Sequence, residues 1–324
     1  MNKSILNTRP LQSVKETVDY NVSNGNDAEL LAASRFVMAC GAEISWGSRN
    51  EDGRKIDLIV SYDHPWIEKE RILVLVQVKS GNTYGELLNE GFTLKTSAKK
   101  QAQRTSHSIC LIWLDRQSNK TFWAYIHPNS LSGNQDYGKN HTICPATRYD
   151  IARCQAKNIP IKSGGAGLII TPNTINLKNK RAKALTYYKN LKLQDIVCPN
   201  LGKIEFSSLG WRHMFRKGRT AKRKETSLAA IEYIDKIVCD KPTDIYISKC
   251  DFFLQSNYTY RKSEYVLAYD EIQLFDGKQN SRIKVIIRLV EEIRWPTDWI
   301  NLGALSQLVD RRLIFLSCYY KDVS

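Results

Sequence analysis

The spacing of apolar and polar residues divides the first 130 residues into a helix, two strands, a second helix and two more strands. Apolar side chains recur at helical spacing over residues 27–40, and this run ends at Gly41. Residues 56–62 alternate between apolar and more polar side chains, as a strand with one buried face does. Residues 72–79 contain consecutive aliphatic side chains, which is typical of a central strand buried on both faces. This order of elements predicts an α/β core.

The later segments follow the same two periodicities: those before residue 130 complete the α/β core, and those beyond Pro199 predict a second, α+β unit with an antiparallel sheet. The expected elements are a helix over 96–105, strands over 108–114 and 121–126, a helix over 178–192, a strand over 203–207, a helix over 226–238, and strands over 265–269, 282–290 and 313–319. We therefore expect two domains, 1–130 and 200–324, with a boundary near Pro199. Residues 131–199 are expected to form a basic linker or docking segment between them.

Charge changes this picture, because basic residues are in large excess. The 48 Lys and Arg residues exceed the 33 Asp and Glu residues and give a formal charge of +15 at pH 7. Residues 131–195 are the most one-sided, with 11 basic and 3 acidic side chains. Such an excess is expected to attract polyanions such as nucleic acid or an anionic membrane surface. The oligomeric state stays open, with a homodimer as one option.

Neither cysteine spacing nor hydropathy suggests a zinc site, a disulfide framework or a membrane anchor. The eight cysteines lie far apart and form no C-x-x-C pair, so we expect reduced and mostly buried thiols. No stretch approaches the roughly 20 apolar residues that a membrane-spanning helix requires, and the N-terminal segment has no apolar core of signal-peptide length. The expected location is the cytoplasm.

Three polar side chains interrupt the apolar pattern on two of the predicted strands. Gln77 and Lys79 are two residues apart and therefore emerge on the same face of their strand. Asp57 lies on the neighbouring predicted strand, where it could converge with them. Hydrolysis of a phosphodiester needs oxygen ligands for Mg²⁺ and a group that positions or deprotonates water. These three residues supply both.

The arrangement of Asp57 followed by Gln77-Val78-Lys79 resembles the PD-(D/E)XK nuclease superfamily, and within it the Mrr-like restriction endonucleases and related prokaryotic domains whose last motif is Q-x-K. The resemblance covers roughly residues 20–127 and implies a restriction-endonuclease-like core, a mixed sheet flanked by helices. It implies that Asp57, Gln77 and the carbonyl of Val78 bind Mg²⁺ or Mn²⁺. It also implies that Glu29 joins these ligands and that Lys79 serves the attacking water. One departure is that Gln77 stands where the family usually has an acid, so the site has one negative charge fewer.

Each of these residues also has a structural interpretation. Asn26 and Glu29 are spaced as an N-cap and its N3 partner, so Glu29 could close a capping box instead of binding metal. Lys79 could be a strand-end lysine whose ammonium reaches water. Asp57 is harder to explain in this way, because a carboxylate beside buried apolar residues normally has a partner or a metal. The helix over 96–105 carries four side chains that could contact phosphates or simply face solvent, namely Lys99, Lys100, Gln101 and Arg104.

A second group of basic residues lies between Trp211 and Lys224, where a run without acids predicts a phosphate-binding loop. The side chains expected to contact phosphates are Arg216, Lys217, Arg219, Lys222 and Arg223. The residues 204–207, His213, a helix and the later strands weakly resemble the barnase, EndoU, colicin and RelE-like ribonucleases. That resemblance implies RNA cleavage without metal, with His213 as the general acid or base and Arg219 or Arg223 on the phosphate. Binding of nucleic acid or of a protein partner, and a purely structural role, are the alternatives.

Together these patterns predict a cytoplasmic Mg²⁺-dependent endonuclease that hydrolyses phosphodiester bonds in DNA. Its C-terminal domain is expected to recognise the target or to add a ribonuclease activity. The resemblance implies a role in prokaryotic antiviral defence or restriction. Two rivals remain, a non-catalytic nucleic-acid-binding protein with a degenerate nuclease fold, and a toxin that acts through a metal-independent C-terminal ribonuclease.

Overall fold

The computed structural model describes residues 20–47, 56–131, 133–158, 164–171, 177–275, 277–302 and 309–323. These residues form two compact units. The first contains the described parts of Met1–Ser34, Ser45–Ile59 and Leu75–Lys139, and the second contains those of Arg35–Ile44, Val60–Val74 and Asn140–Ser324. The described residues between 140 and 199 thus group with the C-terminal part of the chain.

The described residues contain both helices and strands. The helices are α1 (Tyr20–Cys40), α2 (Thr96–Ala102), η2 (Lys139–His141), α3 (Thr147–Asn158), α4 (Leu177–Leu191), α5 (Ser208–Met214), α6 (Ala221–Ile231), α7 (Ile234–Val238) and η3 (Trp299–Asn301). The strands are β1 (Glu43–Trp46), β2 (Leu58–Asp63), β3 (Arg71–Ser80), β4 (Gly85–Leu88), β5 (Gly91–Leu94), β6 (Ile109–Asp115), β7 (Lys120–Ile126), β8 (Gln135–Tyr137), β9 (Ile169–Ile170), β10 (Ile196–Cys198), β11 (Gly202–Ile204), β12 (Asp244–Gln255), β13 (Tyr258–Phe275), β14 (Asn280–Pro296) and β15 (Asp310–Asp322). None of these helices combines the length and the apolar character needed to cross a membrane.

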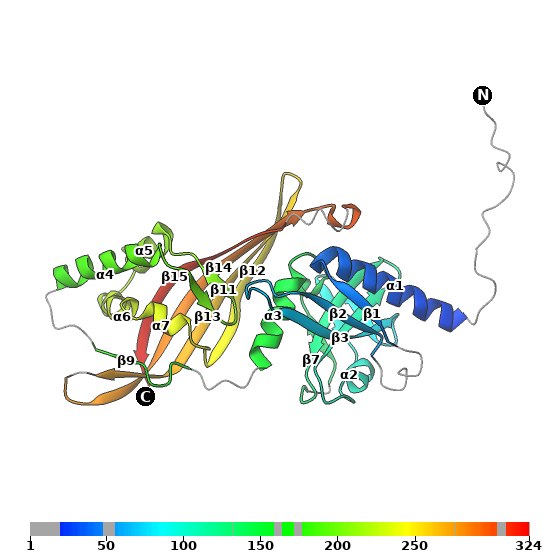
Figure 1. The fold of residues 1–324 in the computed structure, drawn as a ribbon, viewed down its shortest axis with the longest axis horizontal. Coiled ribbons are helices and arrows are strands. Elements are labelled where there is room, and N and C mark those ends of the chain that lie inside the picture. Colours follow the sequence, from blue (N-terminus) through cyan, green and yellow to red (C-terminus); the bar gives the residue numbers. More distant parts are fainter. Residues whose placement is uncertain are drawn as a thin grey trace, which may run out of the picture. The chain divides into compact units, whose positions relative to one another are not determined.

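Five strands form a mixed sheet in the order β1-β2-β3-β6-β7. β3 and β6 run parallel, whereas β6 and β7 are antiparallel. The backbone N–H of Asp57 donates to Val76 at 2.9 Å, and that of His64 donates to Glu70 at 2.9 Å, so β2 and β3 run in opposite directions. A mixed sheet combined with helices confirms the α/β class that the sequence predicts (Figure 1).

One face of β6 and β7 packs against α2 and the small sheet β4-β5-β8. Phe92 of β5 stacks on Trp113 of β6 with ring centroids 5.5 Å apart, and on Phe122 of β7 at 5.1 Å. Leu111 of β6 belongs to the same apolar cluster, while Cys110 is equally buried although its side chain alternates to the other face. Both faces of β6 are therefore covered, as its unbroken apolar sequence predicts.

The second unit is built on the antiparallel strands β12-β13-β14-β15, with the short strand β9 paired in parallel with β13. β13 and β14 are long, with 18 and 17 residues. Side chains from α4, α6 and α7 share one large apolar core with β13, β14 and β15. Figure 1 shows these helices gathered along the sheet. The antiparallel sheet agrees with the α+β expectation for this part of the chain.

A buried ion network ties α3 to this sheet. The fully buried Glu291 of β14 contacts Arg153 at 2.9 Å, Arg311 at 2.7 Å and, more distantly, Arg261 at 3.7 Å. Asp150 also pairs with Arg153, and with Arg261 at 2.6 Å. Burial opposes the charge on Glu291, but the three arginines outweigh burial and hold its pKa at about 2. Three guanidinium groups thus share two carboxylates, and each charge has a partner.

Several elements differ from the sequence-based expectation. The sequence does not predict β12, because most of its side chains are exposed and show no regular burial pattern. The expected helix over 226–238 is two helices, α6 and α7. β3 is buried on both faces only over residues 76–78, since Leu73 is 60% exposed. The run 211–224, expected as a loop, contains most of α5 and the start of α6.

Candidate functional site

Asp57 lies where β2 meets the end of β3. Its backbone N–H donates to the carbonyl of Val76 at 2.9 Å. Its carboxylate Oδ2 accepts the backbone N–H of Val78 at 2.5 Å. Because Asp57 directly precedes β2, this carboxylate takes a place in the strand pairing that a backbone carbonyl would otherwise hold. The structure therefore brings Asp57 against the segment Gln77-Val78-Lys79.

Gln77 is fully buried in β3, and neither amide atom of its side chain has a hydrogen-bond partner among the described residues. In the pairing of β3 with β6 it lies opposite Leu111, so its side chain faces the apolar cluster that contains Phe92 and Trp113. A buried amide without partners costs about 1–3 kcal/mol. Such a group in a native protein calls for a missing partner such as an ion or an ordered water. Gln77 Oε1 is an oxygen donor of the kind that a hard divalent cation binds.

Lys79 lies two residues further along β3, on the same side as Gln77. Its Nζ is 5.6 Å from the centroid of the Tyr84 ring, and the side chain is partly exposed. The aromatic face restrains the ammonium group by a cation–π contact of the kind worth about 0.5–1 kcal/mol at exposed sites. Lys79 is thus held near the end of β3 and still reaches solvent.

Glu29 lies inside α1, which begins at Tyr20. Asn26 is therefore a helical residue and cannot be the N-cap of this helix, so the capping-box interpretation of Glu29 is wrong. Ala28, Ala32 and Phe36 are buried and share one face of α1, at helical spacing. Glu29 is adjacent to that face and is partly buried.

The oxygen donors near the end of β3 are the Asp57 carboxylate, the Gln77 amide and the Val78 carbonyl. Carboxylate, amide and carbonyl oxygens are ligands that Mg²⁺ and Mn²⁺ accept. In the part of the chain that the structure describes, no three His, Cys, Asp or Glu side chains come close enough together to hold a metal ion. A divalent ion at this place would therefore need neutral oxygens in addition to the Asp57 carboxylate.

The four candidate side chains of α2 fall into two classes. Lys99 is 1% exposed, its Nζ donates to Gln135 Oε1 at 2.9 Å, and burial lowers its pKa. Lys99 therefore anchors α2 to β8 and does not belong to a surface that contacts phosphates. Lys100 and Arg104 are exposed and Gln101 is partly exposed, so a phosphate contact stays a prediction for these three.

The basic run after Trp211 surrounds the junction of α5 and α6. His213 lies in α5, Arg216, Lys217 and Arg219 lie in the connecting turn, and Lys222 and Arg223 lie in the first turn of α6. Thr220 is the N-cap of α6 and accepts the backbone N–H of Arg223. The first turn of α6 contains no acid, although the positive end of a helix dipole favours negative charge. Positive charge is thus concentrated at this helix start.

His213 is uncharged at neutral pH. Burial lowers its pKa, and the charges of Arg219, Arg216 and Arg288 lower it further, to about 4. Its Nδ1 lies 3.4 Å from Nη2 of Arg219, where a neutral ring with its proton on Nε2 can accept a hydrogen bond. At pH 7 the ring has no imidazolium proton to donate, which does not favour the expected general-acid role in RNA cleavage.

Two residues near this junction were not selected from the sequence. Arg288 of β14 forms an ion pair with Glu264 and lies opposite Ser317 of β15. The guanidinium of Arg223 lies 3.9 Å from the ring centroid of Tyr319. The sequence did contain a signal for Arg288, because it interrupts the apolar run 285–290 just as Asp57 interrupts its own strand.

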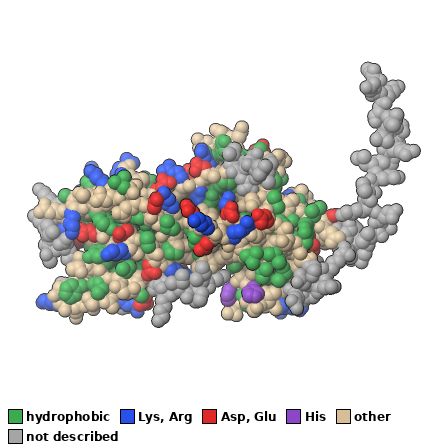
Figure 2. Space-filling view, viewed as in Figure 1, with side chains coloured by type: hydrophobic (Ala, Val, Ile, Leu, Met, Phe, Trp, Pro, Cys, Tyr) green, Lys and Arg blue, Asp and Glu red, His purple; other side chains and the backbone are tan. Residues whose placement is uncertain are grey.

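Surface charge is mixed on the face that Figure 2 draws. Lys and Arg side chains lie among Asp and Glu side chains there and form no continuous basic surface on the part of that face that is described. The formal charge of +15 therefore does not by itself mark a nucleic-acid-binding face. Compact groups of charged side chains whose contacts are known are a better guide to a binding site than the total charge.

Comparison with protein-family models, curated proteins and solved structures reveals no significant match to this chain. Function is therefore inferred from the contacts of Asp57, Gln77 and Lys79, and from the charges around His213.

Proposed function

We propose that this chain is a metal-dependent endonuclease that hydrolyses phosphodiester bonds in DNA. One observation carries the proposal. The carboxylate of Asp57 lies against the backbone of Val78 at 2.5 Å, directly beside the fully buried Gln77, whose amide has no partner in the described residues. A carboxylate and further oxygen donors next to a lysine are the groups that metal-assisted hydrolysis requires.

Each residue has a defined part in this proposal. Asp57, Gln77 Oε1 and the carbonyl of Val78 would hold the ion, and Glu29 would contribute from α1. A bound Mg²⁺ or Mn²⁺ would supply an activated water and neutralise charge on the phosphate. Lys79, restrained by the ring of Tyr84, orients the attacking water or the phosphate oxygen that it approaches.

The direct test is cleavage of plasmid DNA by the full chain in Mg²⁺, in Mn²⁺ and in chelator. Asp57→Asn removes the charge but keeps an oxygen that can accept the Val78 N–H, so the strand junction should survive. We expect metal-dependent cleavage to disappear in Asp57→Asn. Lys79→Gln should lower the rate by roughly 10²-fold or more, the usual contribution of a group that assists proton transfer.

Matched controls make the same charge changes elsewhere. Asp63→Asn alters an exposed aspartate at the other end of β2, and Lys120→Gln alters an exposed lysine at the start of β7. Both should cut DNA as the wild type does. Full activity in a folded Asp57→Asn variant, or cleavage that persists in chelator, would contradict the proposal. Salt-sensitive DNA binding without cleavage in either metal would instead establish the non-catalytic rival.

Gln77→Glu tests whether this side chain faces the ion. In chelator the variant should melt at a lower temperature than the wild type, because it buries a carboxylate without a partner. Mg²⁺ should then raise its melting temperature by more than it raises that of the wild type, since tighter binding gives a larger shift at equal ion concentration. Gln117→Glu, at an exposed turn residue, is the control. Equal Mg²⁺ shifts in the wild type and in Gln77→Glu would place Gln77 away from the ion.

A further inference from the structure

Four arginines come close enough to affect one another's charge where α5 and α6 pack against β15, the neighbour of β14. This arginine group consists of Arg216, Arg219, Arg223 and Arg288. Among the described residues only one of the four, Arg288, has an ion-pair partner, which is Glu264. Burial, followed by the charges of the other three arginines, lowers the pKa of Arg219. The group therefore holds more positive charge than the protein neutralises.

Several polar atoms in this group are buried and lack partners. Arg219 is only 9% exposed. The Nε atoms of Arg219, Arg223 and Arg288 are buried and have no hydrogen-bond acceptor in the described residues. The hydroxyl of Ser317, which lies opposite Arg288 in the sheet, is also buried and unpaired. Buried donors on charged groups are normally satisfied, so the three Nε atoms call for further acceptors, and acceptors with negative charge bind such donors most strongly.

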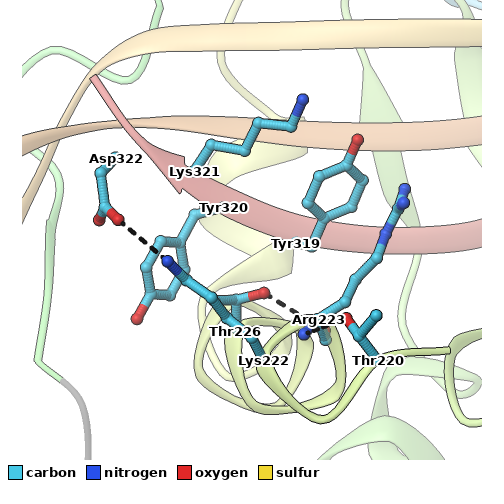
Figure 3. Close-up of a pocket in the computed structure, with 8 residues that line it drawn as sticks. All are labelled: Thr220, Lys222, Arg223, Thr226, Tyr319, Tyr320, Lys321 and Asp322. Atoms are coloured by element: carbon cyan, nitrogen blue, oxygen red, sulfur yellow. Dashed lines mark hydrogen bonds and ion pairs between the residues drawn. The ribbon is translucent and has the colours of Figure 1, made fainter. Parts of the chain in front are cut away.

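A cavity of about 350 Å³ opens beside Arg223. It is lined by Thr220, Lys222, Arg223, Thr226 and residues 319–322. In Figure 3, Arg223 and Tyr319 project to the same side of β15, with the guanidinium 3.9 Å from the ring centroid. Lys321 Nζ lies 5.9 Å from the same ring. The volume is at the lower end of the range of small-molecule sites, roughly 300–1,000 Å³.

We propose that the arginine group and this cavity form a binding site for a phosphate group carried by a nucleotide or by a nucleic-acid strand. Guanidinium groups bind phosphate oxygens in pairs of parallel hydrogen bonds, a geometry that a spherical anion cannot match. The four arginines come from a turn, a helix and a strand that converge, so they suit one or two phosphates rather than a long stretch of backbone. The stacked pair Arg223 and Tyr319 offers a flat surface for a base. This site goes beyond the metal chemistry proposed at Asp57.

His213 acts as a positioning residue in this site. Its neutral ring accepts from Nη2 of Arg219, with 3.4 Å between the two nitrogens, and so fixes the direction of that guanidinium. Repulsion from the nearby arginines keeps the ring neutral. A bound phosphate would offset this repulsion, so the pKa of His213 should rise when the site is filled.

The test is isothermal titration of the full chain in chelator with inorganic phosphate, with AMP and with a short single-stranded oligonucleotide. We expect phosphate to bind and AMP to bind more tightly. Arg219→Gln and Arg288→Gln should each weaken binding at least tenfold, the loss expected when one charged hydrogen-bond donor is removed. Arg212→Gln changes an exposed arginine of α5 outside the group and should bind as the wild type does.

The three ligands also identify the source of the phosphate. Displacement of AMP by the oligonucleotide assigns the site to nucleic acid, whereas AMP that is not displaced assigns it to a free nucleotide. Absence of binding by all three ligands, or equal losses in Arg212→Gln and Arg219→Gln, overturns the proposal. Melting curves without ligand confirm that each variant is folded. Because the titration contains chelator, its outcome is separate from that of the cleavage assay.

The positioning role of His213 has its own readout. His213→Asn places an oxygen near the position of Nδ1 and should retain phosphate binding, whereas His213→Leu should lose several-fold in affinity. The imidazole signals of the wild type should titrate at a higher pH in saturating phosphate than without it. Unchanged affinity in His213→Leu together with an unshifted titration would remove His213 from the site.

Discussion

The second unit contains two groups of arginines that meet very different electrostatic surroundings. In the network around Glu291 and Asp150, burial acts against the guanidinium charges but the carboxylates outweigh it, so the pKa of Arg153 and that of Arg261 are raised. In the arginine group near His213, burial is reinforced by like charges, and the pKa of Arg219 is lowered. The same residue type is thus compensated in one place and uncompensated in the other.

This difference separates a structural network from a candidate binding site. A buried charge with a fixed partner keeps its place without help from outside the protein. A buried charge among like charges lowers stability until an anion binds, and binding then stabilises the protein by mass action. The two groups should therefore respond in opposite ways to substitution and to added phosphate.

The largest expected effect comes from Glu291→Gln. Among the described residues, removal of this carboxylate leaves Arg153 and Arg261 with Asp150 as their carboxylate partner and Arg311 with none, and breaking a buried pair typically costs about 3–5 kcal/mol. Urea unfolding at pH 7 measures this loss. The control is Glu205→Gln, which breaks an exposed pair with Arg312 and should cost less than about 1 kcal/mol. A loss as small as that of the control would show that the network contributes little.

Substitution of Arg153 and of Arg219 by the same residue should affect the stability of the protein differently. Arg153→Met should destabilise the protein by about 3 kcal/mol, since it leaves Glu291 short of a partner. Arg219→Met, measured in phosphate-free buffer, should leave stability unchanged or raise it, because it relieves repulsion and removes a buried donor without an acceptor. Comparable destabilisation in both variants would mean that Arg219 is as well compensated as Arg153.

The two groups should also lose stability in different pH windows. The pKa of His213 is lowered from 6.5 to about 4, so the unfolded chain binds this proton more readily and stability falls as the pH drops from 6.5 towards 4. The pKa of Glu291 is lowered from 4.5 to about 2, so its contribution is present above 4.5 and is lost as the pH falls towards 2.

Urea midpoints measured across this pH range separate the two residues. In His213→Asn, stability should no longer fall between pH 6.5 and about 4, but the loss below pH 4.5 should remain. In Glu291→Gln, only the loss below pH 4.5 should disappear. The upper effect is expected to be the smaller, because the His213 ring is partly exposed. If His213→Asn still loses stability between pH 6.5 and about 4, another titratable group causes that loss.

The smallest effect concerns binding of nucleic acid. If Arg219 and Arg223 contact phosphates, replacing both with Ala should make the slope of log affinity against log salt concentration shallower by up to ~2 units. Arg212→Ala, outside the group, should leave the slope unchanged. An unchanged slope in the double variant would limit the site to a free nucleotide or inorganic phosphate.

Regular burial patterns made much of the fold predictable. The strand expected over 121–126 is β7 (Lys120–Ile126), and the helix expected over 178–192 is α4 (Leu177–Leu191). Periodicity fails where burial is irregular. β12 is largely exposed, and α1 begins at Tyr20, before the apolar residues that first reveal it.

The part of the candidate site formed by the paired strands β2 and β3 was predictable from the sequence. Strand alternation placed Gln77 and Lys79 on one face, and the approach of Asp57 to Val78 followed from the pairing of two adjacent strands. The burial of Lys99, whose ammonium reaches Gln135, and the burial of the His213 ring, which is the main cause of its low pKa, were not predictable, because both depend on tertiary packing.

The hydrogen bond between Asp57 and Val78 makes a single backbone amide a reporter for the proposed metal site. The carboxylate that accepts this N–H at 2.5 Å is the one proposed to hold the ion, so ion binding must redistribute its electron density. The ¹⁵N–¹H signal of Val78 should therefore shift in a Mg²⁺ titration. Its exchange with deuterium should slow when the ion clamps the end of β3 and quicken in chelator. Occupancy of the site can thus be followed without any substrate.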